Sequence, residues 1–314
     1  MDSDRVKRFH NAIIAAEQFL LSHQSSDGLW RDYPALQPGC SEAWTTGVVG
    51  CSLATPPVAS NRRLLVKAAE ALHSIATPNG WGYNRQTACD ADSTAWVWRF
   101  LAQLEFPTER SAVRDLQRFI GDDQAVHTFL GGQFGTWAQS HPDVTPVVGL
   151  ACLAVHASPK FTDLIREAAL AHRAANGLWH SFWWNTDSYA IARNLEFLSA
   201  LNGIPGEIRE LACMWLAAVN GQPCPFVLAN ELAIAASVNH DIGIRHCEKL
   251  LSCQQDDGGW SPSATLLVPS QQNPDAHGSA PSFTDERRIM STAWSLAALK
   301  SWRHRRCHGS VPSV

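Results

Sequence analysis

The sequence predicts an all-α (α/α)6 barrel, and three observations support this fold class. A turn of the form Gly-x-Trp, or a close relative of it, recurs along the 314-residue chain. Segments with apolar residues at helical spacing precede the turns, and segments that are apolar nearly all round follow them. The sequence shows no strand-like alternation. Helical hairpins that repeat in this way stack side by side, and six of them close into a double ring with no unpaired end.

The recurring turns define the repeat. The five clear copies carry Trp30, Trp81, Trp137, Trp179 and Trp260. A degenerate sixth copy is expected near residues 220–223, which gives six units of roughly 50 residues. Glycine permits the left-handed backbone that ends a helix, and the tryptophan can fill the wedge between neighbouring hairpins. We therefore interpret these five tryptophans as structural braces.

Two kinds of helix alternate along the chain. Segments 12–21 and 244–251 are amphipathic, as is typical of an outer ring. The apolar segments after the turns are expected to form the inner ring, at residues 41–50, 93–101, 144–150, 188–195 and 291–299. Ser or Asp at the heads of these segments caps their free N–H groups. We expect one barrel over residues 1–300 and a short basic tail over 301–314.

Composition excludes several classes of protein. The net charge of −4 gives no broad positive field, so nucleic acid is not expected as a partner. The nine cysteines include no Cys-x-x-Cys pair, which favours a reducing cytoplasmic compartment. The N-terminal segment is read as the first amphipathic helix, not a signal peptide. No apolar run reaches the roughly 20 residues of a membrane helix, although peripheral membrane contact stays open.

Three consecutive units place a carboxylate at the head of the inner helix. These residues are Asp92, Asp143 and Asp187. Each alone would be explained as a helix cap worth roughly 1 kcal/mol. If all three converge on one rim of the barrel, they raise the pKa of at least one of them and keep it protonated at neutral pH.

The second unit carries two carboxylates one residue apart. The stretch Asp90-Ala91-Asp92-Ser93-Thr94-Ala95 resembles the Asp-x-Asp-Asp-Thr-Ala motif of class II terpene cyclases, the squalene-hopene and oxidosqualene cyclase superfamily. The turns at 24–30 and 254–260 resemble the Gln-Trp repeats of that family. The repeats cover most of the chain and indicate the fold, whereas only the Asp motif indicates the activity.

The resemblance implies a reaction and roles for individual residues. Asp92 would be the Brønsted acid that protonates a terminal alkene or epoxide of a prenyl or meroterpenoid substrate, after which a carbocation cascade closes rings. Asp90 would be its motif partner, and Ser93 stands where the family has a third Asp. A hydroxyl can still hydrogen-bond a carboxyl. We expect a single-barrel member, monomeric or homodimeric, without a cofactor, with Mg²⁺ needed only if the substrate carries a diphosphate.

Aromatic side chains near these carboxylates suit cation chemistry. A ring face stabilises a carbocation without quenching it, and one well-placed ring contributes about 2 kcal/mol when desolvated. The candidates for lining the cavity are Trp44, Trp96, Trp98, Trp184, Tyr189 and Trp294. The alternative for each of them is an ordinary core position.

Other polar groups leave two interpretations open. His141 and Asn185 lie two residues before Asp143 and Asp187 and could hydrogen-bond the acid, or they could belong to surface loops. Arg99 and Arg193, inside apolar helices, could meet an anionic group of a substrate or form a buried ion pair. The sequence has no Asp-Asp-x-x-Asp box of the kind that ionising terpene synthases use to bind magnesium.

Two other functions remain open at this point. The zinc-dependent β subunit of protein prenyltransferases shares the fold, but its site needs converging Asp, Cys and His ligands. The local clusters His240-Asp241 with His246-Cys247, and Cys307-His308, do not match that pattern. A barrel that only binds a lipid or a partner is the third reading. Alkene or epoxide initiation, and deprotonation or water capture at the end, are left open.

Overall fold

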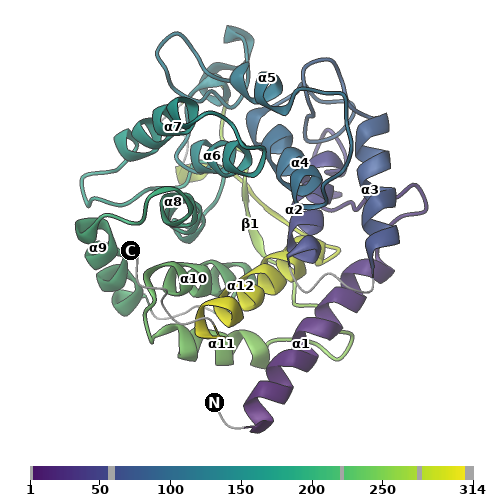
Figure 1. Ribbon diagram of the computed structural model, residues 1–314, viewed down its shortest axis with the longest axis vertical. Helices are drawn as coiled ribbons and strands as arrows, with labels where there is room; N and C mark the ends of the chain where they lie inside the picture. The colour runs from purple at the N-terminus through teal and green to yellow at the C-terminus, as the bar shows by residue number, and fades with distance from the viewer. Residues whose placement is uncertain (1–2, 56–60, 220–222, 274–277, 308–314) are drawn as a thin grey trace.

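The described residues form two concentric rings of helices (Figure 1). The computed structural model describes residues 3–55, 61–219, 223–273 and 278–307. The inner ring comprises α2 (Ala43–Ala54), α4 (Ala91–Gln103), α6 (Thr145–Ala154), α8 (Ser188–Leu201), α10 (Pro225–Val238) and α12 (Ile289–Cys307). Each inner helix contacts the next, and α12 contacts α2, so the ring closes. The predicted (α/α)6 barrel is confirmed; the degenerate turn expected near 220–223 lies almost wholly outside the described residues.

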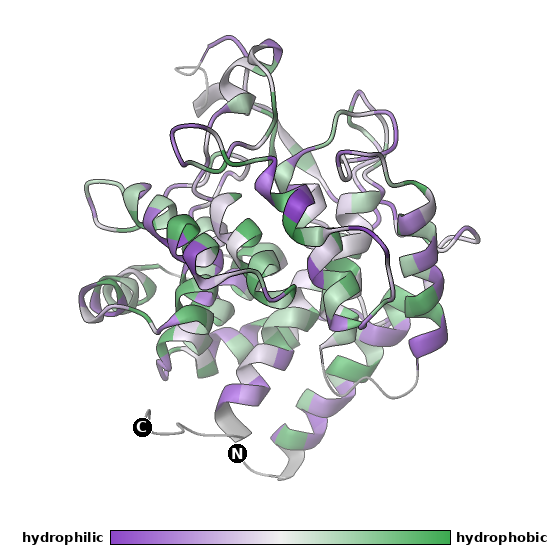
Figure 2. Ribbon diagram, turned by 45° about the horizontal axis from the view of Figure 1, so that its top comes forward, coloured by the Kyte–Doolittle hydropathy of each residue, from purple (hydrophilic) through white to green (hydrophobic). Residues whose placement is uncertain are grey.

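The outer ring alternates with the inner ring along the chain. It comprises α1 (Ser3–Ser22), α3 (Arg62–Ser74), α5 (Ala112–Gln117), α7 (Pro159–Ala171), α9 (Gly206–Ala218) and α11 (Gly243–Ser252). Hydrophilic and hydrophobic residues alternate along α3 (Figure 2) because one face meets the inner ring and the other meets water. Every residue of α2, by contrast, is buried. The two helix types expected from the sequence therefore have different surroundings.

Four of the five turn tryptophans join an outer helix to the barrel. The indole N–H groups of Trp30, Trp81, Trp179 and Trp260 donate at 2.6–2.7 Å to carbonyls in the last turns of α1, α3, α7 and α11. Those carbonyls have no partner within their own helix. The backbone N–H of Trp30 also donates to the Thr46 hydroxyl of α2 at 3.0 Å. The prediction that these four residues are braces agrees with these contacts.

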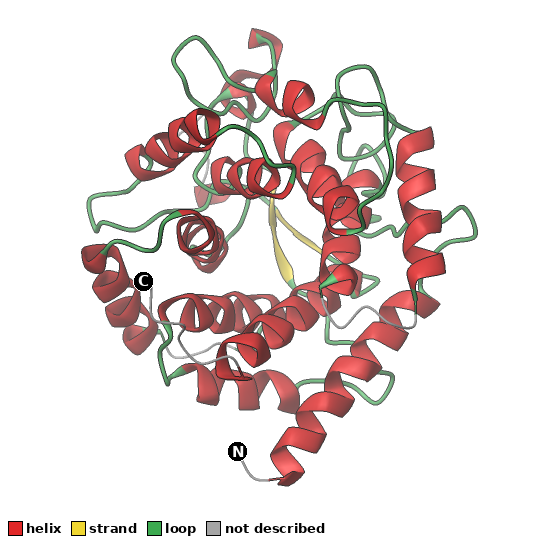
Figure 3. Cartoon of the chain, viewed as in Figure 1, coloured by secondary structure: helices red, strands yellow, loops and turns green. Residues whose placement is uncertain are grey.

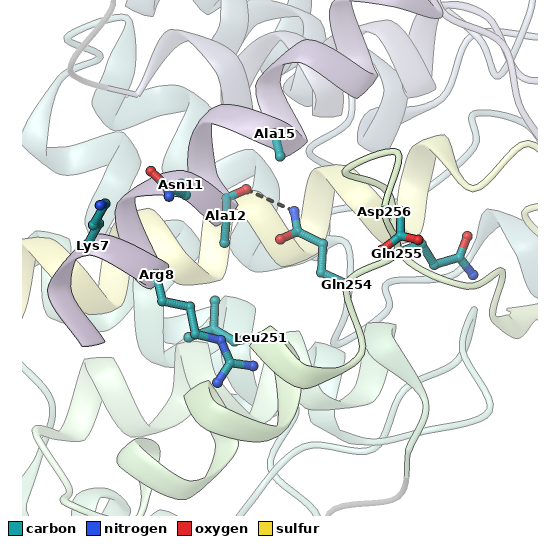
Figure 4. Close-up of a pocket in the computed structure, with 9 residues that line it drawn as sticks. All are labelled: Lys7, Arg8, Asn11, Ala12, Ala15, Leu251, Gln254, Gln255 and Asp256. Atoms are coloured by element: carbon teal, nitrogen blue, oxygen red, sulfur yellow. Dashed lines mark hydrogen bonds between the residues drawn. The ribbon is translucent and has the colours of Figure 1, made fainter. Parts of the chain in front are cut away.

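In two of the turns, a glutamine side chain hydrogen-bonds to the next outer helix. Gln24 donates to the carbonyl of Leu64 in α3 at 3.0 Å, and Gln254 donates to the carbonyl of Ala12 in α1 at 2.9 Å. Figure 4 shows the second of these bonds. Because Gln254 follows α11 and Ala12 belongs to α1, this bond joins the last outer helix to the first and closes the outer ring.

The fifth turn tryptophan, Trp137, does not have the bracing role that the sequence predicts. Trp137 lies in the 3₁₀ segment η1 (Gly132–Ala138), and its indole N–H donates at 2.8 Å to the carbonyl of Pro269. Gly135, with φ of +54°, allows that segment to approach the backbone of Gln271, where a Cβ would collide. Trp137 therefore lines a cavity, as described below, and does not brace an outer helix.

A small antiparallel sheet is a second departure from the expectation. Strands β1 (Ala264–Leu267) and β2 (Ser282–Thr284) form a hairpin against one end of the ring (Figure 3). The sequence pattern missed it because β1 is only four residues long and three of them are buried, so little alternation is visible. The hairpin covers the barrel end at which the inner helices begin.

The last inner helix extends past residue 300, where the sequence predicts the end of the barrel. Helix α12 runs to Cys307, and Trp302 on it is buried against Gly243 of α11. Residues 301–307 are thus helical, and the remainder of the expected tail lies outside the described residues. Among the described helices, none combines the length and apolarity needed to span a membrane.

Candidate active site

The head of α4 is held in place from two sides. The backbone N–H of Asp90 donates to the carbonyl of Trp81 at 3.1 Å, and the N–H of Ala91 donates to the carbonyl of Thr128 at 2.9 Å. Asp90 is the N-cap of the helix: its Oδ1 accepts the backbone N–H of Ser93 at 2.7 Å. These contacts fix the direction in which the next carboxyl, that of Asp92, leaves the helix.

Asp92 faces a cavity of about 640 Å³ at the end of the barrel that the hairpin covers. Asp90, Ser93 and Asp143 also line this cavity. The floor and walls come from the starts of α2, α4, α6 and α8, and the cover comes from β1 and η1. The structure therefore brings together three of the four carboxyl groups that the sequence singles out.

Burial and neighbouring charge favour the protonated form of Asp92. Burial raises the pKa of the Asp92 carboxyl well above its ordinary value, and the Asp90 and Asp143 carboxylates raise it further. The indole of Trp44 and the charge of Arg99 act in the opposite direction and are smaller. The protonated form of Asp92 is thus favoured more strongly than that of an ordinary aspartic acid, and this side chain borders the cavity.

Asp90 is also perturbed, but its role differs. Burial raises the pKa of Asp90 to about 7, although the backbone N–H and the hydroxyl of Ser93 stabilise its ionised form. Its Oδ2 accepts the Ser93 hydroxyl at 2.8 Å, and its Oδ1 is occupied by the helix cap. Hydrogen bonds therefore fix the Asp90 carboxyl in place, and its negative charge raises the pKa of Asp92.

Asp143 is anchored by the chain that follows α7. Its Oδ2 accepts the backbone N–H groups of Phe182 and Trp183 at 2.9 and 2.7 Å. Two such donors suit an ionised carboxylate. The same two bonds hold Trp183 at the cavity wall, so Asp143 both places an aromatic ring and adds negative charge near Asp92.

Aromatic rings form most of the cavity wall. Trp44 lies 5.9 Å from Trp184, and Trp184 lies 4.7 Å from Tyr189, measured between ring centroids. On the opposite side, Trp137 lies 5.3 Å from Trp183. Trp44, Trp184 and Tyr189 were candidates from the sequence, and all three line the cavity. A cation formed next to Asp92 would meet ring faces in several directions.

Solved structures with the same architecture are known. A variant of the type II terpene cyclase MstE from Scytonema, in its apo form, superposes with a TM-score of 0.85 at 23% identity, over 96% of this chain and 99% of that one. The chain has the fold of MstE. Another MstE variant, in complex with geranylgeranyl dihydroxybenzoate as substrate, gives 0.84 at 22% identity over the same shares of the two chains. No protein-family model and no curated protein matches the sequence.

Two further structures extend the comparison. A protein from Actinoplanes has a TM-score of 0.77 at 25% identity, over 94% of this chain and 99% of that one. The ent-copalyl diphosphate synthase from Streptomyces platensis has a TM-score of 0.59 at 16% identity, over 83% of this chain and 50% of that one. These likenesses establish the barrel, and the reaction has to be inferred from the side chains of the cavity.

Three predicted aromatic residues lie outside the cavity lining. Trp98 is edge-on to the brace Trp81 at 5.6 Å, on the side of α4 that faces the turn. Trp96 and Trp294 are edge-on to each other at 5.3 Å and lie deeper in the barrel. None of the three is among the lining residues, although Trp44 at the position equivalent to Trp96 is. Trp98, six residues after Asp92, lies on another face of α4, and Trp96, four residues after Asp92, lies one helical turn further along the same face.

Asp187 and Asn185 belong to the surface near the hairpin. Asp187 accepts the backbone N–H of Ser181 at 3.0 Å and pairs with His180 at 2.7 Å. Asn185 donates to the carbonyl of Ala264 at 2.8 Å and so anchors β1. The expectation that Asp187 converges on the rim with Asp92 and Asp143 is therefore not met: Asp187 is the half-exposed N-cap residue of α8 and is not among the residues that line the cavity.

The remaining polar candidates have structural partners. His141 is buried, lies 3.8 Å from Phe182 between ring centroids, and its Nδ1 is hydrogen-bonded to the Thr128 hydroxyl at 2.7 Å. Arg99 and Arg193 both bind Glu196, the first at 2.7 Å. Their guanidinium groups lie over the rings of Trp96 and Trp294. For the two arginines, the buried ion pair is the arrangement that the structure shows.

Sequence reasoning missed part of the lining. Further cavity residues come from the loops before α2 and α4, from the segment before η1, and from the hairpin: they include Gln37, Tyr83, Gln86, Phe129, Phe134, Trp183, Leu266 and Gln271. Most of these lie outside the inner-helix heads that guided the prediction. The run Phe182-Trp183-Trp184 was the one available signal for Trp183.

The structure also bears on a metal site and on a second hollow. Within the described residues, no group of three or more His, Cys, Asp or Glu side chains could hold a metal ion. His246, one of the zinc-ligand candidates, is buried and pairs with Glu231 at 3.1 Å. A second hollow of about 510 Å³ lies between α1 and α11, lined by residues such as Lys7 and Arg8 (Figure 4). It is more open and lies on the outside of the barrel, far from the carboxyl cluster in the fold.

Proposed function

We propose that this protein is a class II terpene cyclase. In this proposal, Asp92 protonates a terminal alkene or epoxide of a linear prenyl or meroterpenoid substrate, and the cavity guides closure of the rings. The observation that carries the proposal is the surroundings of Asp92: its carboxyl, whose pKa is raised by burial and by two carboxylate neighbours, lines a cavity walled by aromatic rings.

The chemistry is a redox-neutral cyclisation that needs no oxidant or reductant. The O–H bond of Asp92 breaks as a C–H bond forms at the terminal alkene carbon from its π electrons, or as an O–H bond forms at an epoxide oxygen and the C–O bond to the more substituted carbon breaks. The cation left at the more substituted carbon is attacked by the next double bond, which forms a C–C bond. The last cation loses a proton or takes up water, and Asp92 regains a proton before the next turnover.

The cavity lowers the barrier in two ways. A carboxylic acid is a weak donor to an alkene, so proton transfer must be coupled to stabilisation of the developing cation. Trp44, Trp184 and Tyr189 offer ring faces close to the acid. The cover formed by η1 and β1 excludes water that would quench the cation early.

The proposal also assigns roles to the residues around Asp92. Asp90, Ser93 and Asp143 are proposed to tune the acid, and Trp44, Trp184 and Tyr189 to contact the substrate. The reaction needs no resident cofactor in this proposal. In this proposal the enzyme is a single barrel, monomeric or homodimeric. It works in the cytoplasm and has peripheral access to prenyl lipids dissolved in a membrane.

The test is product formation by matched variants. Wild type, Asp92→Asn and Asp163→Asn would be incubated with C15 and C20 prenyl alcohols, and cyclic products measured by mass spectrometry. Asp163 is exposed on the outer helix α7, so its variant controls for the substitution itself. We expect at least a 1,000-fold loss in Asp92→Asn with unchanged circular dichroism, and full activity in the control. Equal activity of wild type and Asp92→Asn would contradict the role of Asp92, and absence of cyclic product from wild type with every substrate would favour the binding-only alternative.

A further inference from the structure

The open end of the cavity is lined by amide side chains. Gln37 and Gln86 are exposed, whereas Asp90 and Trp184 at the inner end are buried, as is the Oδ1 atom of Asp92. A linear substrate whose terminal alkene reaches Asp92 extends its other end, the head group, toward Gln37, Gln86 and Gln271. We call these three glutamines the amide rim.

The amide rim is fixed by the backbone around it. Asn84 is buried, and its side-chain amide donates to the carbonyls of Pro38 and Cys40 at 2.8 and 3.1 Å. Its Oδ1 accepts the backbone N–H of Gln86 at 2.9 Å. One side chain therefore ties the loop that carries Gln37 to the loop that carries Gln86. The third glutamine is held because the carbonyl of Gln271 accepts the backbone N–H of Thr136 at 2.9 Å.

The charges around the cavity are unfavourable for an anionic head group. The acidic side chains among the described lining residues are those of Asp90, Asp92 and Asp143, and no basic side chain is among them. A diphosphate or carboxylate that enters a cavity of this kind is repelled by the ionised carboxylates and loses its hydration. The aromatic walls offer no counter-charge.

The guanidinium groups next to the rim are committed to other partners. Arg85, which precedes Gln86, binds the Glu42 carboxylate through Nε at 2.8 Å and Nη2 at 3.1 Å. Arg31 binds the same carboxylate at 2.9 Å and also binds Asp27. Two arginines thus share two carboxylates, so this network leaves no net positive charge to attract an anion.

We propose that this enzyme selects prenyl substrates with a neutral, hydrogen-bonding head group, an alcohol or a phenol, which the amide rim binds. This inference rests on the proposed function, because it needs the alkene end of the substrate at Asp92. Each glutamine amide can donate to and accept from a hydroxyl, so the rim satisfies such a head group without a charge. It also makes magnesium unnecessary, since no diphosphate has to be neutralised.

The experiment compares C20 chains that differ only at the head. Geranylgeraniol, a geranylgeranyl phenol, geranylgeranoic acid and geranylgeranyl diphosphate would be given to wild type, and kcat/KM for cyclic products measured. We expect the two neutral compounds to exceed the two anions at least tenfold. In Gln86→Leu the KM for the neutral compounds should rise several-fold with little change in kcat. In Gln37→Arg the ratio of diphosphate to alcohol turnover should rise at least tenfold.

Binding separates this inference from the proposed function. The Kd of each compound for Asp92→Asn would be measured by quenching of tryptophan fluorescence. Tighter binding of the neutral compounds supports the inference, even if wild type turns over none of them and the proposed function fails. Preference of wild type for an anion, with cyclic products formed, leaves the function standing and overturns the inference. Absence of binding by all four compounds also overturns it.

Discussion

The Ser93 hydroxyl donates to Oδ2 of Asp90 at 2.8 Å, while the Ser93 backbone N–H donates to Oδ1 at 2.7 Å. Serine thus stands at the third position of the Asp motif as a hydrogen-bond donor. A third carboxylate there would bring a negative charge, whereas the hydroxyl stabilises the ionised form of Asp90. Asp90, with a pKa of about 7, in turn raises the pKa of Asp92.

Ser93→Ala is expected to weaken both the fold and the acid. Loss of the buried hydroxyl bond should lower the free energy of unfolding by about 1–2 kcal/mol. Asp90 would then stay neutral to higher pH and would raise the pKa of Asp92 less, so the alkaline limb of kcat/KM should move to lower pH. Denaturant unfolding and a pH profile measure the two effects. Ser93→Thr keeps the hydroxyl and is the control; an alkaline limb that does not move in Ser93→Ala would contradict this role of Ser93.

Asp143 and Asp187 are expected to behave differently, although the sequence treats them alike. Asp143→Asn removes a charge that raises the pKa of Asp92 and disturbs the two bonds that hold Trp183, so kcat should fall at least tenfold. Asp187→Asn changes a surface pair with His180 and should keep kcat within about threefold, because exposed pairs contribute little. Steady-state kinetics of the two variants decide the matter. A larger loss in Asp187→Asn would restore the rim predicted from the sequence.

Stability is expected to fall as the pH rises from 4 to 7. Burial raises the pKa of Asp90 and of Asp285 to about 7, whereas the unfolded chain titrates near 3.9. Between these values the folded state binds more protons, so the free energy of unfolding decreases with pH, by up to roughly 4 kcal/mol per group. The raised pKa of Asp92 adds to this slope with the same sign. Urea unfolding at pH 4.5, 6 and 7.5 measures the slope.

Asp285→Asn tests the source of that slope. Asp285 accepts the backbone N–H groups of Ser263 and Ser291 and lies near the Asp32 carboxylate. The variant loses stability at every pH, because an amide cannot accept both bonds, but its slope between pH 4.5 and 7.5 should be shallower than that of wild type, with the remaining slope due to other buried carboxyl groups such as Asp90 and Asp92. An unchanged slope would show that Asp285 does not titrate in this range.

Two tryptophan variants should separate architecture from chemistry. Trp179→Phe removes the donor to the carbonyl of Ala169 and leaves that buried carbonyl unpaired, so the free energy of unfolding should fall by about 2 kcal/mol with the products unchanged. Trp137→Phe releases the bond to Pro269 in the cavity cover and should alter the product ratio with a smaller loss of stability. Differential scanning calorimetry and product analysis report the two effects. The reverse outcome would make Trp137 a brace after all.

The fold could be predicted from the sequence because its signals are local. A Trp whose indole donates to the last turn of an outer helix, and an inner-helix Thr whose hydroxyl accepts the backbone N–H of that Trp, recur in three of the hairpins. The grouping of Asp90, Asp92 and Ser93 at the cavity could be predicted for the same reason, since the three lie within one turn at the head of α4.

The rest of the site depends on contacts between segments far apart in the chain. Trp137 meets Pro269, and Asn84 ties Gln86 to the loop of Gln37. No spacing in the sequence reports such contacts. For Trp96, Trp98 and Asp187, the position along the repeat was predicted correctly but the direction of the side chain was not. That direction depends on the exact start of each helix.

The transfer of a proton from Asp92 to carbon is the central claim, and solvent deuterium tests it most directly. Wild type would be incubated in D₂O with the best C20 alcohol substrate, and the cyclic products analysed by mass spectrometry and NMR. Because the carboxyl of Asp92 exchanges with solvent, we predict one deuterium per product molecule, on the former terminal alkene carbon, and no product from Asp92→Asn. Cyclic product without deuterium at that carbon, or labelled product from Asp92→Asn, would contradict the account.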